Sequence, residues 1–242
     1  MEGIPLNRIL LMVLRNILVV PGAYAKLCHY AKHTDEYPEQ EKWDHIHYIM
    51  RLAVNSGNID LTVTGEENLP EQNGFVLYAN HQGMFDVVAL AGTCKRPLGA
   101  VLKKELADVP LLKQIRECTY SFAMDREDVR QSLTVIKGVT EEVLKGRNFL
   151  IFPEGTRSKN GNVMGEFHGG SFRAAQKAKC PIVPLCFIDC HRVLDEKGSK
   201  PVAVQMHYLK PIPYEEYKDL KTVEIAELVK GRIQACIDEH TA

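Results

Sequence analysis

His81 and Asp86, a histidine and an aspartate in the run Asn-His-Gln-Gly-Met-Phe-Asp at 80–86, are well suited to acid–base chemistry. A neutral imidazole is a usable general base when a carboxylate holds its other ring nitrogen, because the carboxylate fixes the tautomer and stabilises the imidazolium. On a regular helix, five residues turn through about 500°, which leaves the two side chains roughly 140° apart. The pair therefore needs a turn, and Gly83 supplies backbone freedom for it.

A second motif, Phe-Pro-Glu-Gly-Thr-Arg-Ser at 152–158, follows an apolar run, just as His81 follows the apolar run at 75–79. Together with the His-x4-Asp spacing, this motif resembles those of the glycerolipid acyltransferase family, and within it the bacterial 1-acyl-glycerol-3-phosphate acyltransferases. Two shorter blocks, at 122–126 and 182–185, are similar to the remaining motifs of that family. The resemblance extends over roughly residues 60 to 210.

The resemblance implies an enzyme that moves a fatty acyl group from acyl-CoA or acyl-carrier protein to the sn-2 hydroxyl of 1-acyl-glycerol 3-phosphate, forming phosphatidic acid in phospholipid synthesis. His81 would deprotonate the hydroxyl and Asp86 would orient the ring. No Ser or Cys lies in a nucleophile-elbow context, so direct transfer without an acyl-enzyme is the simpler mechanism. Two alternatives stay open: an acyltransferase acting on another lysophospholipid or a lyso-aminolipid, and a non-catalytic lipid-binding protein.

The phosphate of lysophosphatidate needs cationic partners, and the resemblance implies that Arg126 and Arg157 hold it through their planar guanidinium groups. Lys103 and Lys104 follow the apolar run 98–102, where they would bind phosphate or stabilise an oxyanion; solvated lysines at a helix start are an equal alternative. We expect Glu154 to serve as scaffold, paired with Arg157, rather than to contact substrate. The expected supporting loop residues are Glu154, Gly155, Thr156 and Pro184.

Composition restricts the class of protein. A chain of 242 residues with 45% hydrophobic content and no Pro- or Ser-rich linker can bury one sizeable core. Its formal net charge of -1 argues against a nucleic-acid partner. Seven scattered cysteines fit a reducing compartment, offer no zinc framework, and make Cys186 and Cys190 buried apolar residues rather than redox groups. We therefore expect neither a metal site nor a cofactor.

The N-terminal segment suggests contact with a membrane. Its apolar run is interrupted by Arg15 and ended by Pro-Gly at 21–22, so it is a poor membrane-spanning helix, and an arginine inside the apolar run also argues against an export signal. Arg8 and Arg15 lie seven positions apart on one side of a helix, from which they would reach lipid phosphates. We expect residues 6–32 to bind an anionic surface at the cytoplasmic face of the cell membrane, as a peripheral or monotopic segment; an ordinary core helix is the alternative.

Hydrophobic periodicity predicts the elements that must position these groups. A helix with apolar residues from Trp43 to Val54 should end at Gly57, and short apolar runs then alternate with helical stretches, which is typical of an α/β fold with a mostly parallel sheet flanked by helices. We predict an N-terminal two-helix segment at 1–57 and an acyltransferase domain at 58–242. The expected strands are 59–64, 75–79, 98–102, 119–123, 148–152, 182–188 and 202–208, and the expected helices are 85–94, 110–117, 127–145, 168–179 and 222–238.

Overall fold

The computed structural model describes residues 6–125 and 127–241. Its centre is a seven-stranded sheet in the order β1-β7-β6-β2-β5-β3-β4. All neighbouring strands in it are parallel except β6 and β7, which are antiparallel. The strands are β1 Ile59–Thr64, β2 Val76–Ala79, β3 Leu98–Lys103, β4 Phe122–Met124, β5 Asn148–Ile151, β6 Ile182–Ile188 and β7 Val202–Tyr208. The predicted mostly parallel α/β sheet is confirmed.

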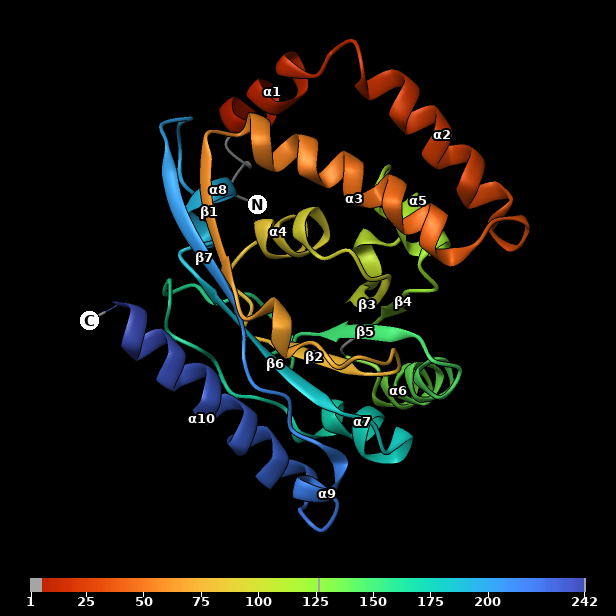
Figure 1. The fold of residues 1–242 in the computed structure, drawn as a ribbon, viewed down its shortest axis with the longest axis vertical. Coiled ribbons are helices and arrows are strands. Elements are labelled where there is room, and N and C mark those ends of the chain that lie inside the picture. The colour runs from red at the N-terminus through yellow and green to blue at the C-terminus, as the bar shows by residue number, and fades with distance from the viewer. Residues whose placement is uncertain (1–5, 126, 242) are drawn as a thin grey trace.

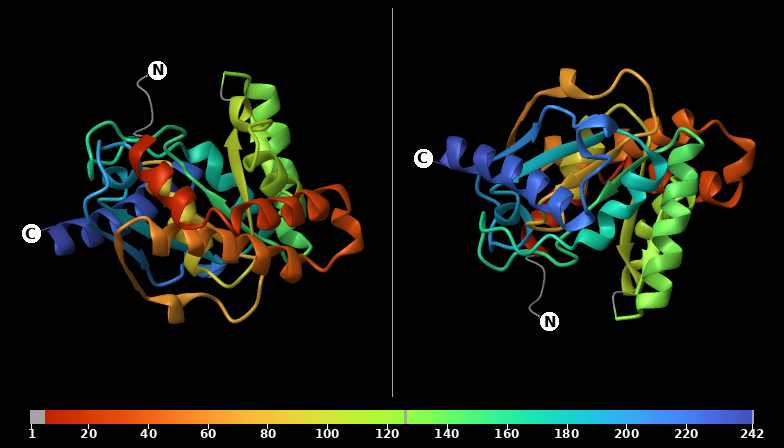
Figure 2. Two further views of the ribbon diagram at one scale, coloured as in Figure 1. Left: turned by 90° about the horizontal axis from the view of Figure 1, so that it is seen from above. Right: turned by 90° about the horizontal axis from the view of Figure 1, so that it is seen from below.

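Helices cover both faces of this sheet (Figure 1). One layer holds α1 Leu6–Arg15, α2 Val20–Lys32, α3 Glu39–Ser56, α4 Phe85–Thr93, α5 Leu112–Cys118 and the short α8 His191–Leu194. The opposite layer holds α6 Val129–Leu144, α7 Arg173–Ala178, α9 Tyr214–Tyr217 and α10 Thr222–Thr241. Seen from below, α10, α7 and α6 follow one another across that face (Figure 2).

Strand β2 shows why the sheet is buried on both sides. Leu77 and Ala79 belong to the hydrophobic cluster beneath α3 and α4, whereas Val76 and Tyr78 belong to the cluster beneath α7 and α10. Successive side chains of a strand point to opposite faces, so a strand covered on both faces reads as a continuous apolar run. This central strand ends where the His81 motif begins.

The N-terminal segment contains one helix more than the sequence predicted. The Pro-Gly pair at 21–22 does not end a helix there; Pro21 lies in the first turn of α2. Proline is tolerated in a first turn because the N–H that it lacks would have no partner within the helix. Helices α1 and α2 therefore precede α3, which ends at the predicted Gly57.

The two arginines of α1 differ in exposure: Arg8 is buried, whereas Arg15 is exposed. Arg8, 4% exposed, donates to the main-chain oxygens of Gly57 and Lys200, at 2.7 and 2.8 Å. Arg15 donates to the main-chain oxygen of Ser56 at 2.8 Å and to Oδ1 of Asn58 at 2.6 Å. The prediction that Arg8 reaches lipid phosphates is wrong, because this buried side chain satisfies main-chain carbonyl groups. For exposed Arg15 it stays a prediction.

Besides Arg15, the outer surface of α1, of the turn at 16–19 and of the start of α2 is mostly apolar. Leu18 is 95% exposed, and the other exposed apolar side chains there are Leu10, Val13, Leu14, Ile17, Val19 and Val20. Within residues 6–125 and 127–241, no helix is by itself long and apolar enough to cross a membrane; residues 8–15 with α2 pass that test only as a pair bent by 93°.

One predicted strand boundary and one predicted loop residue need correction. The strand expected at 119–123 begins only at Phe122, because Tyr120 has a left-handed backbone, with φ of 54°, and forms the turn after α5. Pro184, expected in a supporting loop, lies buried within β6. The main-chain oxygen of Pro184 accepts from the N–H of Leu209, just beyond β7. In a strand, the N–H and C=O of one residue point to the same side, so the N–H that Pro184 lacks would also face β7. The pairing of β6 with β7 begins only at Leu185, so no hydrogen bond of that pairing is lost.

Candidate active site

His81 and Asp86 meet across the turn between β2 and α4. The Nδ1 atom of His81 lies 2.7 Å from Oδ2 of Asp86, within hydrogen-bond distance, and Asp86 is fully buried in the first turn of α4. The predicted contact is confirmed. Because a carboxylate only accepts, Nδ1 carries the proton and the lone pair is on Nε2. Across residues 6–125 and 127–241, the His81 ring makes no other hydrogen bond, so the geometry is that of an oriented general base.

The same carboxylate oxygen shapes the turn. Oδ2 of Asp86 also accepts from the main-chain N–H groups of Gln82, at 2.7 Å, and Gly83, at 3.0 Å. Gly83, expected to supply backbone freedom, does not have a positive φ; its lack of a side chain allows close packing instead. A Cβ atom at this position would lie 3.0 Å from Oδ2 of Asp195 and 3.2 Å from Cα of His191. Asp195 therefore lies directly against the turn that carries His81.

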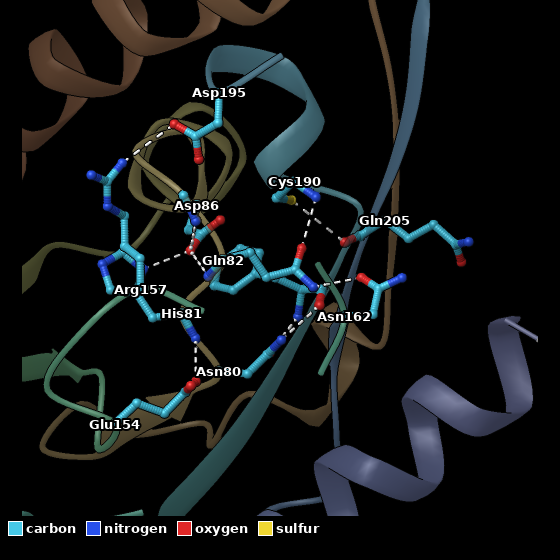
Figure 3. A network of polar contacts seen from close by, with 12 residues as sticks. Asn80, His81, Gln82, Asp86, Glu154, Arg157, Asn162, Cys190, Asp195 and Gln205 are labelled. Carbon is cyan, nitrogen blue, oxygen red and sulfur yellow. Dashed lines mark hydrogen bonds and ion pairs between the residues drawn. The ribbon is translucent and has the colours of Figure 1, made fainter. Parts of the chain in front are cut away.

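The second motif reaches His81 because β2 and β5 are parallel neighbours, with Tyr78 in register with Ile151. The ring of Phe152 stacks on His81, with centroids 4.0 Å apart and planes tilted by 22°. The main-chain N–H of Ser158 donates to the main-chain oxygen of His81 at 2.8 Å. Motifs some seventy positions apart in the chain thus form one site (Figure 3).

Glu154 is a buried scaffold residue, as expected, but its partners are not the predicted one. Oε1 accepts from the main-chain N–H of His81 at 2.7 Å, and Oε2 accepts from that of Gly165 at 2.8 Å. Burial raises the pKa of Glu154, against the opposing effect of these two donors. The carboxylate therefore ties the His81 turn to the loop at 155–165.

Arg157 pairs with Asp195, at the end of α8, rather than with Glu154. Its Nη1 atom lies 3.3 Å from Oδ1 of Asp195, and both side chains are about half exposed, at 48% and 40% (Figure 3). Burial raises the pKa of Asp195, and the charge of Arg157 opposes that rise. Since Asp195 contacts the turn at Gly83, a guanidinium group is held at the edge of the candidate site.

The remaining predicted residues have separate positions. Lys103 pairs with Glu105 at 2.8 Å and Lys104 with Asp125 at 3.4 Å; both lysines are at least half exposed. Thr156 is exposed on the second motif. Gly155 has φ of 68°, which its lack of a side chain permits. Arg126 lies outside the described residues.

Sequence reasoning missed a polar network on the far side of His81. Asn80 both accepts from and donates to the main chain of Phe187, at 2.8 Å each, which extends the pairing of β2 with β6 beyond Ala79. Gln82, 1% exposed, accepts from the N–H of Cys190 at 2.8 Å and donates to Asn162 at 2.6 Å (Figure 3). The signal available in the sequence was the pair of amide residues on either side of His81, because amide groups that become buried need hydrogen-bond partners.

The chain is similar to known proteins over most of its length. The family model described as acyltransferase matches residues 60–188, which is more than half of the chain. The chain is 29% identical over 197 residues to a 1-acyl-sn-glycerol-3-phosphate acyltransferase of Saccharomyces cerevisiae, covering 80% of this chain and 64% of that relative. It is 30% identical over 171 residues to the Escherichia coli protein of the same name, covering 70% of this chain and 69% of the relative. Some of these relatives are therefore matched over less than two thirds of their length.

The fold is also that of a solved structure. The crystal structure of the 1-acyl-sn-glycerophosphate acyltransferase from Thermotoga maritima superposes with a TM-score of 0.75, covers 96% of each chain, and is 20% identical in sequence. Both His81 and the second motif lie within the stretch that the family model matches. This chain belongs to the acyltransferase family.

Proposed function

We propose that this chain transfers a fatty acyl group from acyl-CoA or acyl-carrier protein to the sn-2 hydroxyl of 1-acyl-glycerol 3-phosphate and so forms phosphatidic acid. The observation that carries the proposal is the 2.7 Å contact between Nδ1 of His81 and buried Asp86, which leaves the lone pair on Nε2. A pure lipid-binding protein has no use for such an oriented base.

His81 begins the reaction. Its Nε2 atom accepts the proton of the sn-2 hydroxyl while the hydroxyl oxygen attacks the thioester carbonyl carbon, and Asp86 stabilises the resulting imidazolium. The tetrahedral intermediate collapses, the carbon–sulfur bond breaks, and the imidazolium returns its proton to the leaving thiolate. An ester and a free thiol result, with no acyl-enzyme and no cofactor.

Arg157 supplies the charge that recognises the phosphate of the acceptor. A guanidinium group matches phosphate oxygens in two parallel hydrogen bonds and stays charged at any relevant pH. Asp195, 3.3 Å from Arg157, has a single negative charge, and the phosphate of lysophosphatidate would replace it as the stronger partner. Lys103, Lys104 and Arg126 remain candidates for the same role.

The enzyme would work at the cytoplasmic face of the cell membrane, because its acceptor and product are lipids. The support is the mostly apolar outer surface of α1, of the turn at 16–19 and of the start of α2, where Leu14 is 55% and Leu18 is 95% exposed. Lys26 and Lys32 are also exposed, so they can contact anionic headgroups. Since Arg8 is buried and bonded to main-chain oxygens, insertion of apolar side chains is the main contribution, and exposed Arg15 adds a cation.

An assay with purified protein tests the reaction. Incubation with 1-acyl-glycerol 3-phosphate and either acyl donor should yield phosphatidic acid and one equivalent of free thiol. Mass spectrometry measures the phosphatidic acid, and a thiol reagent measures the thiol. A panel of lysophosphatidylcholine, lysophosphatidylethanolamine and a lyso-aminolipid tests the acceptor. Preferred acylation of any of these would replace lysophosphatidate as the substrate, and binding to liposomes with no product from any pair would favour a lipid-binding protein.

A further inference from the structure

The last strand and the last helix bring together three side chains that the acyltransferase site does not use. His207 comes from β7, and Cys236 and His240 lie on the helix α10 that covers this face of the sheet (Figure 1). Residues four apart on a helix share one face, so Cys236 and His240 both face the strand. His207 and Cys236 are buried, whereas His240 is exposed. This cluster could not be recognised in the sequence, because His207 lies in a different element and far along the chain from Cys236 and His240.

The distances suit a shared ligand. One donor atom from each residue lies within 4.8 Å of the other two. Sγ of Cys236 is 3.8 Å from Nδ1 of His240, and the rings of His207 and His240 have centroids 4.2 Å apart. The Nδ1 atom of His240 is 2.9 Å from the main-chain oxygen of Cys236 and donates to it, which leaves Nε2 as the nitrogen for a metal. A tetrahedral zinc ion, with Zn–S of about 2.3 Å and Zn–N of about 2.0 Å, holds its donors roughly 3.5 Å apart. Small side-chain rotations, easiest for exposed His240, would complete that geometry.

Both ring nitrogens of His207 have a partner. Its Nδ1 atom is 2.7 Å from the Thr64 hydroxyl, and its Nε2 atom is 3.0 Å from Oε1 of Gln205. Because an amide oxygen only accepts, Nε2 carries the proton in this arrangement. The Thr64 hydroxyl can also accept, so the other tautomer, with Nδ1–H bonded to Thr64, leaves Nε2 available to a metal.

We propose that His207, Cys236 and His240 form a zinc site that fastens α10 to β7. Two imidazole nitrogens and one sulfur are borderline-soft donors, which suit Zn²⁺ and disfavour Mg²⁺ or Ca²⁺. Water takes the fourth position on the exposed side of His240. On binding, the thiol of Cys236 loses its proton to the buffer, and the thiolate and two neutral imidazoles become ligands. The site is independent of the acyl-transfer reaction.

Calorimetric titration of the reduced, chelator-treated protein with ZnCl₂ tests the proposal. It should show one equivalent bound and, from the heats in two buffers of different ionisation enthalpy, about one proton released at a pH below the thiol pKa. Cobalt, used as a probe, should give a thiolate-to-cobalt charge-transfer band. Because loss of even an outer-shell partner costs about 10- to 100-fold in affinity, Cys236→Ser and His240→Gln should each weaken binding by more than about 100-fold.

Control substitutions of a cysteine and a histidine outside the cluster test whether zinc binding is specific to it. Cys28→Ser on α2 and His33→Gln after it remove the same chemical groups elsewhere and should leave zinc binding unchanged. Zinc should also raise the melting temperature of the wild-type protein and of these controls, in a concentration-dependent way, but not that of the site variants. Absence of a bound equivalent in the wild-type protein, equal affinity in Cys236→Ser, or binding without the charge-transfer band would each overturn the site.

Discussion

The main-chain N–H of His81 donates a 2.7 Å hydrogen bond to Oε1 of Glu154. This bond joins the residue proposed as base to the middle of the second motif. The other oxygen of Glu154 accepts from Gly165. Glu154 is therefore a positioning residue, which sets where the His81 ring stands relative to the loop that carries Arg157.

Glu154→Gln should lower kcat and destabilise the fold. The amide NH₂ would face one of the two main-chain N–H groups, so a buried donor loses its partner, at a cost of about 1 to 3 kcal/mol. Displacement of His81 should reduce kcat by about 10- to 100-fold, with a smaller effect on KM. Steady-state kinetics and urea unfolding measure the two effects. The control is exposed Glu166→Gln in the same loop; equal kcat in both variants would contradict the positioning role.

Glu154 should also contribute to the pH dependence of stability. Burial raises its pKa above the ordinary 4.5. Just above 4.5, the unfolded chain has released this proton while the folded chain still holds it, so the free energy of unfolding falls as pH rises through that window. Urea unfolding at a series of pH values should show a shallower fall in Glu154→Gln than in the wild-type protein. An identical slope in both would refute this contribution.

His81→Ala should abolish acyl transfer while the protein stays folded, because removal of a general base costs about 10²- to 10⁴-fold. Asp86→Asn should reduce kcat by a similar factor, since an amide does not hold the Nδ1–H tautomer and meets the N–H groups of Gln82 and Gly83. The matched control is His168→Ala, at an exposed histidine near the second motif. Product formation by His81→Ala at the wild-type rate would exclude the mechanism.

Arg157→Ala should raise KM for lysophosphatidate by about 10- to 100-fold, because charge-assisted hydrogen bonds contribute about 1.5 to 3 kcal/mol. Asp195→Asn should act in the opposite direction and lower KM by about fivefold at most, since it releases an ion pair that is largely exposed. Initial rates at varied acceptor concentration measure both. Arg173→Ala on α7 is the control, and a KM for Arg157→Ala equal to that of the control would remove Arg157 from phosphate binding.

The paired substitution of Leu14→Ser and Leu18→Ser should weaken binding to anionic liposomes by more than about tenfold, because each buried leucine side chain contributes about 1.5 to 3 kcal/mol. Both side chains face solvent in the free protein, at 55% and 95% exposure, so the fold should remain. Leu133→Ser with Leu144→Ser on α6 is the matched control, with leucines 49% and 65% exposed. Sedimentation that falls equally in both pairs would refute a specific role of α1.

Deletion of the N-terminal segment is a poor substitute for these variants. Leu27 and Tyr30 of α2 belong to the core, and Arg8 binds the main chain at Gly57 and Lys200. A truncated chain would lose those contacts together with the exposed surface. Point substitutions separate the two effects.

The sequence alone predicted every strand of the sheet, because a short apolar run bounded by polar turn residues can be recognised without knowing which strands pair with it. It also identified the His81 motif and the motif at 152–158. Both could be recognised from residue types at short spacing: a histidine and an aspartate suited to acid–base chemistry, and an arginine suited to binding phosphate. The requirement for a turn between His81 and Asp86 followed from helical geometry. Only the left-handed backbone at Tyr120 moved a strand boundary by more than about two residues.

Tertiary structure decided which of these groups meet. The sequence predicted Arg8 as an exposed cation on an amphipathic helix, yet it is buried and donates to main-chain oxygens of later segments. Arg157 pairs with Asp195, and His207 meets α10, because strand order brings distant segments together. Local periodicity reports which face of an element is buried, but the partner across that face depends on long-range pairing of strands, which no short window of sequence contains.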